Sequence, residues 1–555
     1  MKKFRIHIWA LFLLILSAPF IQAQSQAKSD DYYLELKKGW DHLQRVFELI
    51  NRHYVDEIRP YPLLKSGIEG MLDKLDPYTV FIESNGEDRL RMITTGRYGG
   101  VGMEIGLRNK NVTVIAPIEN SPAAKSGIQA GDIIEKIDGQ DISGWPLDKV
   151  SSKLRGKVGT KVRLLIKRPC IGHRFEVELT RAEIVLEDVG YTGFVAPGVG
   201  YVSLKGFTEK APHELQQAIL SLKQSGQLNG LILDLRGNPG GLLESAVKVV
   251  NLFVPKNTLV VYTKGAREKE YRFYTQGDPI LPETPLVVLV NGGSASASEI
   301  VAGALQDLDR AVIVGLPTFG KGLVQKVFNI DKSQDVKLKI TTAKYYIPSG
   351  RCIQKKDYGK DGVIVLDSVS SDPNDHTFFT LNKRKVHDRG GIEPDVEVRN
   401  DSLATVAIDL IRKNMLFDFA VQFHQKHPQW ADSSFTITPE IFNAFQNFLK
   451  EKDFHFTLEG EREIKKIKKL VEKRGYDSGI IDLIDQLQKK LQANKQIEFE
   501  RHQDQIKELL RLELAEKYYG NKWRHKLALE KDKQVKKASE ILIDQKNYRQ
   551  ILASQ

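Results

Sequence analysis

The stretch LILDLRGNPGG, residues 231–241, decides how this chain folds. Its first half is apolar apart from Asp234, as in a buried strand, and its glycines permit a tight turn before a helical pattern at 242–253. N–H groups close to the start of a helix can bind an oxyanion, so this turn is a candidate anion site. A turn that needs glycine only for its dihedral angles is the alternative.

Further strands and helices alternate on both sides of this unit, at 198–204, 212–224, 286–290, 296–306 and 311–314. Strands that alternate with helices indicate an α/β domain in which helices cover a sheet. We place this domain at 182–400.

A serine-rich stretch, NGGSASASE at 291–299, also joins a predicted strand to a helix. It is not G-x-S-x-G, so it does not support the nucleophile elbow of the α/β-hydrolases. Ser296 and Glu299 have the spacing of a capping box. Ser296 can therefore be a helix cap, or a nucleophile at a helix start where the dipole favours negative charge.

A lysine lies between two glycines in TFGKGLVQ, residues 318–325. Lys321 can act as a base at neutral pH only if its pKa falls from near 10.4 to about 7, which costs about 4 kcal/mol. A low-dielectric site beside the apolar run would supply that shift, and serine with a neutral lysine is a known variant of triad chemistry. A solvated lysine in a flexible loop is the alternative.

Four glycine-containing pieces follow one another between residues 97 and 181, at 99–103, 121–127, 131–134 and 137–139. In this order they resemble a PDZ domain of the bacterial, protease-associated type. In such a domain, backbone N–H groups capture a C-terminal carboxylate and a strand edge adds the peptide. We expect the carboxylate loop at Gly100, Val101, Gly102 and Met103, with a preference for apolar terminal side chains.

Taken together, these stretches resemble the C-terminal processing protease family, also called tail-specific proteases. The segments 70–77, 346–351 and 390–395 share the resemblance, which covers roughly residues 40–400. It implies a crotonase-type α/β protease core with the PDZ domain ahead of its catalytic part. The implied reaction is hydrolysis of a peptide bond through an acyl-enzyme.

The resemblance also implies roles for single residues. Ser296 is the nucleophile, and it is preferred to Ser294 and Ser298 because it is the serine followed by Ala-Ser-Glu. Lys321 is the general base and Gln325 orients it. The oxyanion donors are the Ala297 amide and an amide of the pair Gly240 and Gly241.

Export is predicted for the chain, to the periplasm or the cell envelope. Three basic residues precede an apolar run at 6–16, which is too short to span a bilayer and is typical of a signal peptide at 1–23. An uncleaved anchor is the alternative.

Composition excludes several classes of protein. The chain has 555 residues and a formal net charge of +11. It has only two cysteines, and this low number excludes a disulfide-stapled fold and a cysteine-rich zinc module. The positive charges are spread among many acids, so we expect no nucleic-acid partner, and we expect no metal or cofactor. Whether Cys170 and Cys352 form a disulfide is left open.

Both ends of the mature chain are predicted to be helical. We expect an N-terminal helical region at 24–96 and a charged helical extension at 401–555, which packs on the protease core or on a second subunit. The predicted partners are proteins or peptides with free apolar C-termini, with a homo-oligomer and an adaptor as further expectations. Two alternatives remain: a non-catalytic PDZ protein that binds tails, and a histidine-dependent hydrolase.

Overall fold

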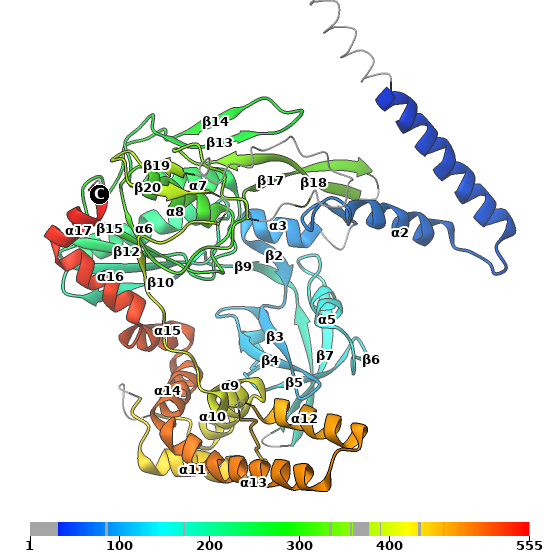
Figure 1. Ribbon diagram of the computed structural model, residues 1–555, viewed down its shortest axis with the longest axis vertical. Helices are drawn as coiled ribbons and strands as arrows, with labels where there is room; N and C mark the ends of the chain where they lie inside the picture. The colour runs from blue at the N-terminus through cyan, green and yellow to red at the C-terminus, as the bar shows by residue number, and fades with distance from the viewer. Residues whose placement is uncertain are drawn as a thin grey trace, which may run out of the picture. The chain divides into compact units, whose positions relative to one another are not determined.

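The computed structural model describes residues 31–83, 87–169, 172–331, 333, 336–355, 358, 377–388, 390–430, 435–458 and 460–553 (Figure 1). The predicted signal peptide and Cys170 lie outside these residues. The chain divides into two compact units, Met1–Phe81 and Ile82–Gln555.

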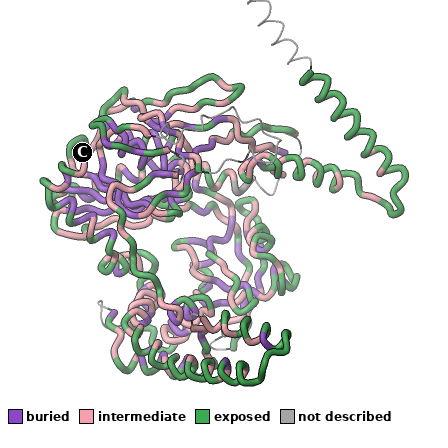
Figure 2. The backbone as a smooth tube through the Cα atoms, in the orientation of Figure 1, coloured by how far each residue is buried: buried purple, intermediate pink, exposed green. Residues whose placement is uncertain are grey.

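The first unit is helical. Residues 31–53 form one helix and α2 (Pro60–Leu72) forms another, with a proline in its first turn, where the fixed φ favours helix initiation. Neither helix has a core of its own: α2 buries no residue, and Trp40 is 66% exposed on the other helix (Figure 2). The short strand β1 (Val80–Ile82) spans the boundary between the units.

A six-stranded sheet forms the centre of the second unit. Its order is β10 (Val189–Ala196), β11 (Val199–Leu204), β12 (Gly230–Asp234), β15 (Leu286–Val290), β16 (Val312–Gly315) and β21 (Val396–Glu397). From β11 to β21 neighbouring strands are parallel, and β10 is an antiparallel edge. The α/β prediction is confirmed.

Helices cover both faces of this sheet. One face packs on α6 (Ala211–Ser225), α7 (Leu243–Val250) and α8 (Ala297–Asp307). The other packs on the last two helices of the chain, α16 (Lys533–Ile543) and α17 (Gln545–Leu552). A parallel sheet needs cover on both faces, and the C-terminal extension supplies the second layer by packing on the core.

A second, antiparallel sheet contains β13 (Leu259–Lys264), β14 (Tyr271–Tyr274), β17 (Leu323–Asp331) and β18 (Val336–Tyr346). The strands β17 and β18 form a long hairpin that begins two residues after Lys321. A short hairpin, β19 (Thr377–Phe379) and β20 (Lys385–His387), is separate from both sheets.

The PDZ region has its own sheet, in the order β3 (Met103–Arg108), β4 (Asn111–Pro117), β5 (Ile133–Ile137), β7 (Lys161–Arg168) and β8 (His173–Thr180), with β6 (Gln140–Asp141) beside β5. The helices α4 (Pro122–Lys125) and α5 (Leu147–Leu154) complete it. The antiparallel strands β2 (Arg97–Gly100) and β9 (Ala182–Val185) pair where the chain enters and leaves the PDZ region. The helix α3 (Glu87–Thr95) precedes β2 and falls within the helical region predicted at 24–96.

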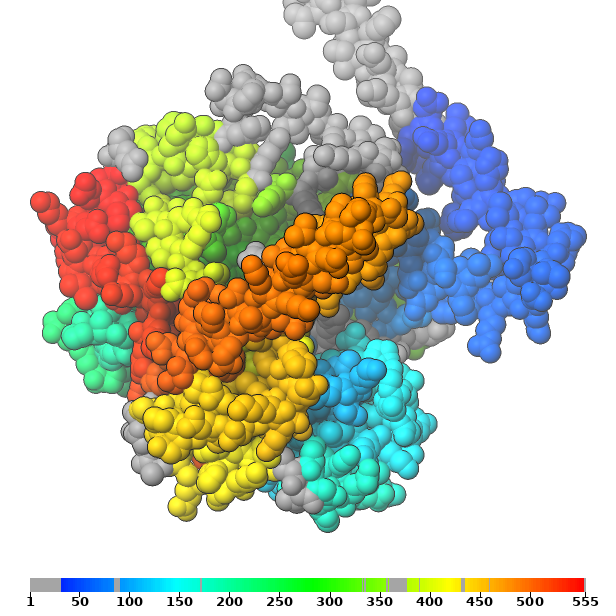
Figure 3. All heavy atoms as spheres, turned by 60° about the horizontal axis from the view of Figure 1, so that its bottom comes forward, coloured from blue at the N-terminus to red at the C-terminus, as the bar shows by residue number. Residues whose placement is uncertain are grey.

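In the described part of the chain, seven helices follow the central sheet and precede α16. They are α9 (Thr405–Arg412), α10 (Met415–Lys426), α11 (Pro439–Glu451), α12 (Glu461–Arg474), α13 (Ser478–Arg501), α14 (Gln503–Tyr519) and α15 (Asn521–Glu530). Their core is rich in phenylalanine, with Phe419, Phe442 and Phe445 buried. This helical domain lies beside the PDZ domain, where the Arg108 guanidinium is 4.1 Å from the Phe417 ring centroid (Figure 3).

Each helix among the described residues is too short or too polar to span a lipid bilayer. The same residues contain no cluster of three or more His, Cys, Asp or Glu side chains that could hold a metal ion.

Candidate active site

Three loops that are far apart in the sequence meet at one edge of the central sheet. They follow β12, β15 and β16, which are adjacent parallel strands, so their carboxyl ends lie side by side. The loops carry Gly240, Ser296 and Lys321, respectively. The sheet order therefore brings together the stretches that the sequence singled out separately.

Ser296 has a strained backbone. It is a half-buried residue directly before α8, with φ 55° and ψ −113°, a region that residues other than glycine rarely adopt. Such a conformation costs about 1–3 kcal/mol and is typical of functional sites. The strand–turn–helix geometry of a nucleophile elbow is thus present although the G-x-S-x-G sequence is not.

The hydroxyls of the two neighbouring serines make buried hydrogen bonds to backbone carbonyls. Ser294 is fully buried and its Oγ donates to the Leu235 carbonyl at 2.7 Å. Ser298 is also fully buried and its Oγ donates to the Asn238 carbonyl at 2.9 Å. Ser296 and Glu299 form the predicted capping box at the start of α8: the Ser296 side chain faces the backbone N–H of Glu299 without a full cap hydrogen bond, and the Glu299 carboxylate accepts from the Ser296 N–H at 2.8 Å. Among the described residues, the Ser296 hydroxyl is therefore the one of the three that donates to no buried carbonyl.

A buried carboxylate ties the serine loop to the lysine loop. Glu299 Oε2 accepts hydrogen bonds from the backbone N–H of Ser296 at 2.8 Å and of Lys321 at 2.9 Å. Its Oε1 accepts from Thr318 Oγ1 at 2.6 Å and from the Gly320 N–H at 2.7 Å. Burial raises the pKa of Glu299, and these four hydrogen bonds oppose that rise.

Tyr345 makes a second connection between the same two loops. Its hydroxyl lies 3.1 Å from the Ser296 carbonyl oxygen and 2.5 Å from that of Lys321, and its one proton is shared between them. The side chain is 1% exposed, and burial raises the pKa of its hydroxyl well above the ordinary value. Tyr345 therefore stays a neutral donor.

The glycine turn packs directly against Ser296. A Cβ on Gly240 would lie 2.7 Å from the Ala295 carbonyl oxygen and 2.9 Å from the Ala297 nitrogen, so only glycine allows this approach. The Gly240 N–H donates to Asn238 Oδ1 at 2.9 Å. Among the described residues, neither the Gly241 N–H nor the Ala297 N–H has an acceptor.

Gln325 lies on β17 and is half-buried. Its Nε2 donates to Thr341 Oγ1 on β18 at 3.1 Å. The chain between Lys321 and Gln325 enters the hairpin directly, with a strand irregularity between Val324 and Gln325. The hairpin thus fixes the position of this glutamine.

The predicted carboxylate loop joins β2 to β3: Gly100 is the last residue of β2 and pairs with Ala182, and Met103 begins β3, the edge strand of the PDZ sheet. The Val101 carbonyl accepts from the Ala123 N–H at 2.9 Å, and the Gly102 carbonyl accepts from the Ile118 N–H at 2.9 Å. In a trans peptide the next N–H points the opposite way, so the amides of Gly102 and Met103 face away from these donors. This orientation suits a carboxylate.

Glu299, Tyr345 and Asn238 are site residues that the sequence did not identify as such. Asn238 is fully buried, and its carbonyl accepts from the Ala295 N–H at 3.0 Å as well as from Ser298 Oγ. The capping-box spacing drew attention to Glu299 only as a helix cap. Tyr345 adjoins the 346–351 segment but carries no local signal, because its partners lie on other elements.

Four parts of the chain match known protein families. Residues 198–364 match peptidase family S41 and residues 113–168 match the PDZ domain. Residues 406–542 match the C-terminal helical domain of probable PDZ-proteases, and residues 15–86 match the N-terminal domain of the activating protease CtpB. These matches and the fold define the class of protein: a peptidase with a PDZ domain.

Individual relatives narrow this class. The carboxy-terminal-processing protease of Bartonella bacilliformis is 39% identical over 348 residues, covering 61% of this chain and 78% of that protein. The carboxyl-terminal-processing protease of Synechocystis sp. is 35% identical over 394 residues, covering 67% and 90%. The solved photosystem II D1 C-terminal processing protease is 30% identical, covering 64% and 92%, with a TM-score of 0.35. The chain belongs to the C-terminal processing protease family.

Proposed function

We propose that this protein is an exported serine endopeptidase, in which Ser296 is the nucleophile and Lys321 the general base. The observation that carries the proposal is the contrast among three serines: Ser294 and Ser298 donate to buried carbonyls, whereas Ser296 is strained, half-buried and tied to the lysine loop. Strain that the surrounding structure maintains is expected at a reactive residue.

The proposed reaction has two stages. Ser296 Oγ attacks the substrate carbonyl carbon while Lys321 Nζ takes the hydroxyl proton. The tetrahedral intermediate then expels the amine, which receives the proton from Lys321, and an acyl-enzyme remains. A water molecule then attacks the acyl carbon while Lys321 Nζ takes one of its protons. The bond from the acyl carbon to Ser296 Oγ breaks, Ser296 recovers its proton from Lys321, and the peptide leaves with a new C-terminal carboxylate.

For the oxyanion we propose the N–H groups of Ala297 and Gly241. Both lie beside the serine loop, and Ala297 is at the start of α8, where the helix dipole also favours negative charge. Gly240 has a different part: its N–H already binds Asn238, and its lack of a side chain lets the turn approach Ser296. We propose that Gln325 orients Lys321 from β17.

Substrate choice is assigned to the PDZ domain. We propose that the loop from Gly100 to Met103 binds a terminal carboxylate and that the peptide adds to the edge of β3. Met103 is buried and Ile105 half-buried on that strand, so apolar C-terminal residues are favoured. Peptides with a free apolar C-terminus should be cleaved faster than amidated ones, and equal rates would contradict this assignment.

The catalytic assignment is tested with five single substitutions and an internally quenched peptide that ends in a free apolar residue. Ser296→Ala and Lys321→Ala should each lower kcat by at least about a thousandfold, because nucleophile and base act as a unit. Gln325→Ala should leave measurable activity.

Ser294→Ala and Ser298→Ala are the matched controls. Each removes a buried hydroxyl that donates to a carbonyl, which costs about 1 kcal/mol of stability, and both should retain most of the parent kcat. If Ser296→Ala cleaves like the parent while either control is inactive, the nucleophile is misassigned.

Self-association is assigned to the first unit. Its helices expose apolar side chains such as Trp40, Leu43 and Met71, which are 66%, 47% and 56% exposed. We propose that a second copy of the chain covers them. Light scattering should give a multimer that Leu43→Glu dissociates; a monomeric parent would instead leave this surface for an adaptor.

Export rests on the N-terminal sequence alone. Basic residues ahead of a short apolar run, followed by small residues, favour cleavage after Ala23. Protein isolated from the cell envelope should begin at Gln24. An intact Met1 on that protein would indicate an uncleaved anchor.

A further inference from the structure

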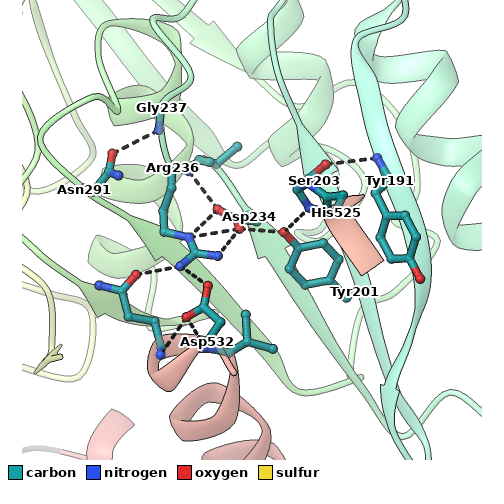
Figure 4. Close-up of polar contacts among 12 residues, drawn as sticks. Tyr191, Tyr201, Ser203, Asp234, Arg236, Gly237, Asn291, His525 and Asp532 are labelled. Carbon is teal, nitrogen blue, oxygen red and sulfur yellow. Dashed lines mark hydrogen bonds and ion pairs between the residues drawn. The ribbon is translucent and has the colours of Figure 1, made fainter. Parts of the chain in front are cut away.

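The glycine turn of the active site is held from outside the peptidase domain. Arg236 directly precedes this turn, and its side chain is only 14% exposed. On one side its Nη2 lies 2.5 Å from Asp234 Oδ2, at the end of β12. On the other side its Nη1 lies 2.6 Å from Asp532 Oδ2 and 2.8 Å from Gln534 Oε1 (Figure 4). Two acids from different domains therefore share one guanidinium.

Asp532 is a rigid partner because it also caps a helix. Its Oδ1 accepts from the N–H groups of Gln534 at 2.9 Å and Val535 at 3.2 Å, and its Oδ2 is left for Arg236. The helix that begins here, α16, lies on the central sheet through buried residues such as Leu542. The cap therefore cannot move unless the second helical layer moves with it.

The core side of the arrangement is equally enclosed. Asp234 Oδ2 accepts from the Tyr201 hydroxyl at 2.6 Å, and His525 Nε2 lies 3.1 Å from that hydroxyl. Although burial opposes the charge, Arg236 holds the pKa of Asp234 below its usual value. Burial lowers the pKa of His525 to about 4, so this histidine is neutral at pH 7. The charged groups are thus Asp234, Arg236 and Asp532.

From Arg236 the connection to the catalytic serine is short. The Gly237 N–H donates to Asn291 Oδ1 at 2.9 Å, and the Asn238 carbonyl accepts from Ala295 and Ser298, which flank Ser296. A shift of Arg236 would therefore be passed to the turn that contacts Ser296 and to the serine loop itself. A displacement of about 1 Å at an active site can cost about a hundredfold in rate.

We propose that Arg236 is a positioning residue for the oxyanion turn and that Asp532 and Gln534 of the C-terminal helical domain hold it in place. The active site of this peptidase is then complete only when α16 is seated on the sheet. The inference rests on the proposed function, since it assumes that the turn after Arg236 stabilises an oxyanion.

The test is Asp532→Asn, which removes the charge facing Arg236 but keeps a good helix cap, since Asn caps as well as Asp. The matched control is Asp544→Asn. Asp544 caps α17 through the N–H groups of Lys546 and Asn547, both at 3.1 Å, and is exposed at the surface. Both variants alter one cap on the same helical layer, and only the first touches Arg236.

Three quantities are measured for parent and variants: kcat and KM on the quenched peptide, the inhibition constant of a peptide aldehyde with the same acyl sequence, and the melting temperature. The aldehyde forms a tetrahedral adduct, so it reports on the oxyanion turn. Asp532→Asn should lower kcat by about tenfold, weaken the aldehyde by a similar factor, and leave KM within about twofold. Its melting temperature should match that of Asp544→Asn.

Equal kcat and equal aldehyde inhibition in Asp532→Asn and Asp544→Asn would overturn the proposal. The proposal would also be overturned if the loss of kcat in Asp532→Asn were explained by loss of folded protein. That result would appear as a lower melting temperature and fewer titratable active sites. Failure of the proposed function gives a different result, because the parent would then lack hydrolysis that depends on Ser296.

Discussion

The backbone amides of Ser296 and Lys321 donate to the same oxygen atom, Glu299 Oε2, at 2.8 and 2.9 Å. Their nitrogens therefore cannot be farther apart than the sum of these two distances. Tyr345 links the carbonyls of the same two residues. The two loops follow different strands, yet they are joined through the N–H groups of these two residues by Glu299 and through their carbonyls by Tyr345. These contacts fix the proposed nucleophile and base relative to each other.

Tyr345→Phe should separate this positioning effect from stability. The change removes one buried hydroxyl and almost no volume, so it should cost only about 1 kcal/mol of stability, while kcat should fall by about tenfold because the two loops lose a shared donor. Tyr346→Phe, on the adjacent and half-buried residue, is the control. A kcat equal to that of the parent in Tyr345→Phe would show that the hydrogen bonds of Glu299 alone hold the two loops in position.

Protonation of Glu299 should have opposite effects on the activity and on the stability of the protein. Burial raises its pKa in the folded protein above that of an unfolded chain. Its contribution to stability is therefore fully present below the ordinary glutamate pKa and is lost as pH rises through the raised value. Activity should change in the other direction, because a protonated carboxyl cannot accept all four hydrogen bonds.

The measurement compares the parent with Glu299→Gln between about pH 4 and pH 7, using unfolding free energies and kcat. The difference in unfolding free energy between the two proteins should move against the parent as pH rises. Protonation of the proposed base Lys321 lowers kcat in both proteins at acid pH, so the parent, which also protonates Glu299, should lose kcat more steeply than the variant. Parallel pH profiles would contradict a role for Glu299 titration.

The second helical layer should be essential for folding. Leu542 on α16 is 2% exposed and lies over Gly230 of β12, where an added Cβ would be 3.1 Å from it. Leu542→Ala should lower the free energy of unfolding by about 2–5 kcal/mol. The neighbouring Ile543 is 63% exposed, so Ile543→Ala should change it by less than about 0.5 kcal/mol.

Truncation after Asp401 tests the same layer as a whole. It removes α16 and α17 and exposes the sheet face that contains Tyr201, Ile232 and Leu289. The truncated protein should aggregate or melt far below the parent, even though Ser296 and Lys321 remain in it. A truncated protein with the parent's melting temperature and kcat would show that this layer is dispensable.

Gly102 should be required for binding of C-terminal tails. Its φ is 72°, and an added Cβ would lie 2.3 Å from Ser121 Cβ, so Gly102→Ala must displace the proposed carboxylate loop. We expect at least about tenfold weaker binding of a labelled tail peptide, measured by fluorescence anisotropy. Gly127→Ala is the control, because its φ is 77° and its added Cβ meets nothing within 4 Å. Equal affinities would place the tail elsewhere.

Local patterns in the sequence predicted much of the architecture. The apolar run at 286–290 coincides with β15, and the segment 296–306 lies within one residue of α8 at both ends. Such elements are predictable because hydrophobic spacing and turn residues act over a few positions. The glycine and serine stretches were found for the same reason, since each lies within a dozen residues.

Some contacts could not be predicted in this way. The sequence left Ser296 as cap or nucleophile, and the structure contains the capping box. The proposal of a nucleophile depends on the backbone strain of Ser296 and on the buried partners of Ser294 and Ser298, and neither is visible in the sequence. The apolar residues of the C-terminal extension gave no sign of which element they cover. Ile467 and Leu470 are 51% and 54% exposed on α12, whereas Leu510 and Leu514 are fully buried.

The sequence by itself therefore determined the α/β core, the PDZ segment and the residue types available for catalysis, because spacing along the chain carries that information. Only the tertiary structure decided that Glu299 and Tyr345 join the serine and lysine loops, that α16 and α17 form the second layer, and that Asp532 reaches Arg236. These contacts depend on the order of the strands and on the face to which each side chain points. Both arise only when distant parts of the chain pack together.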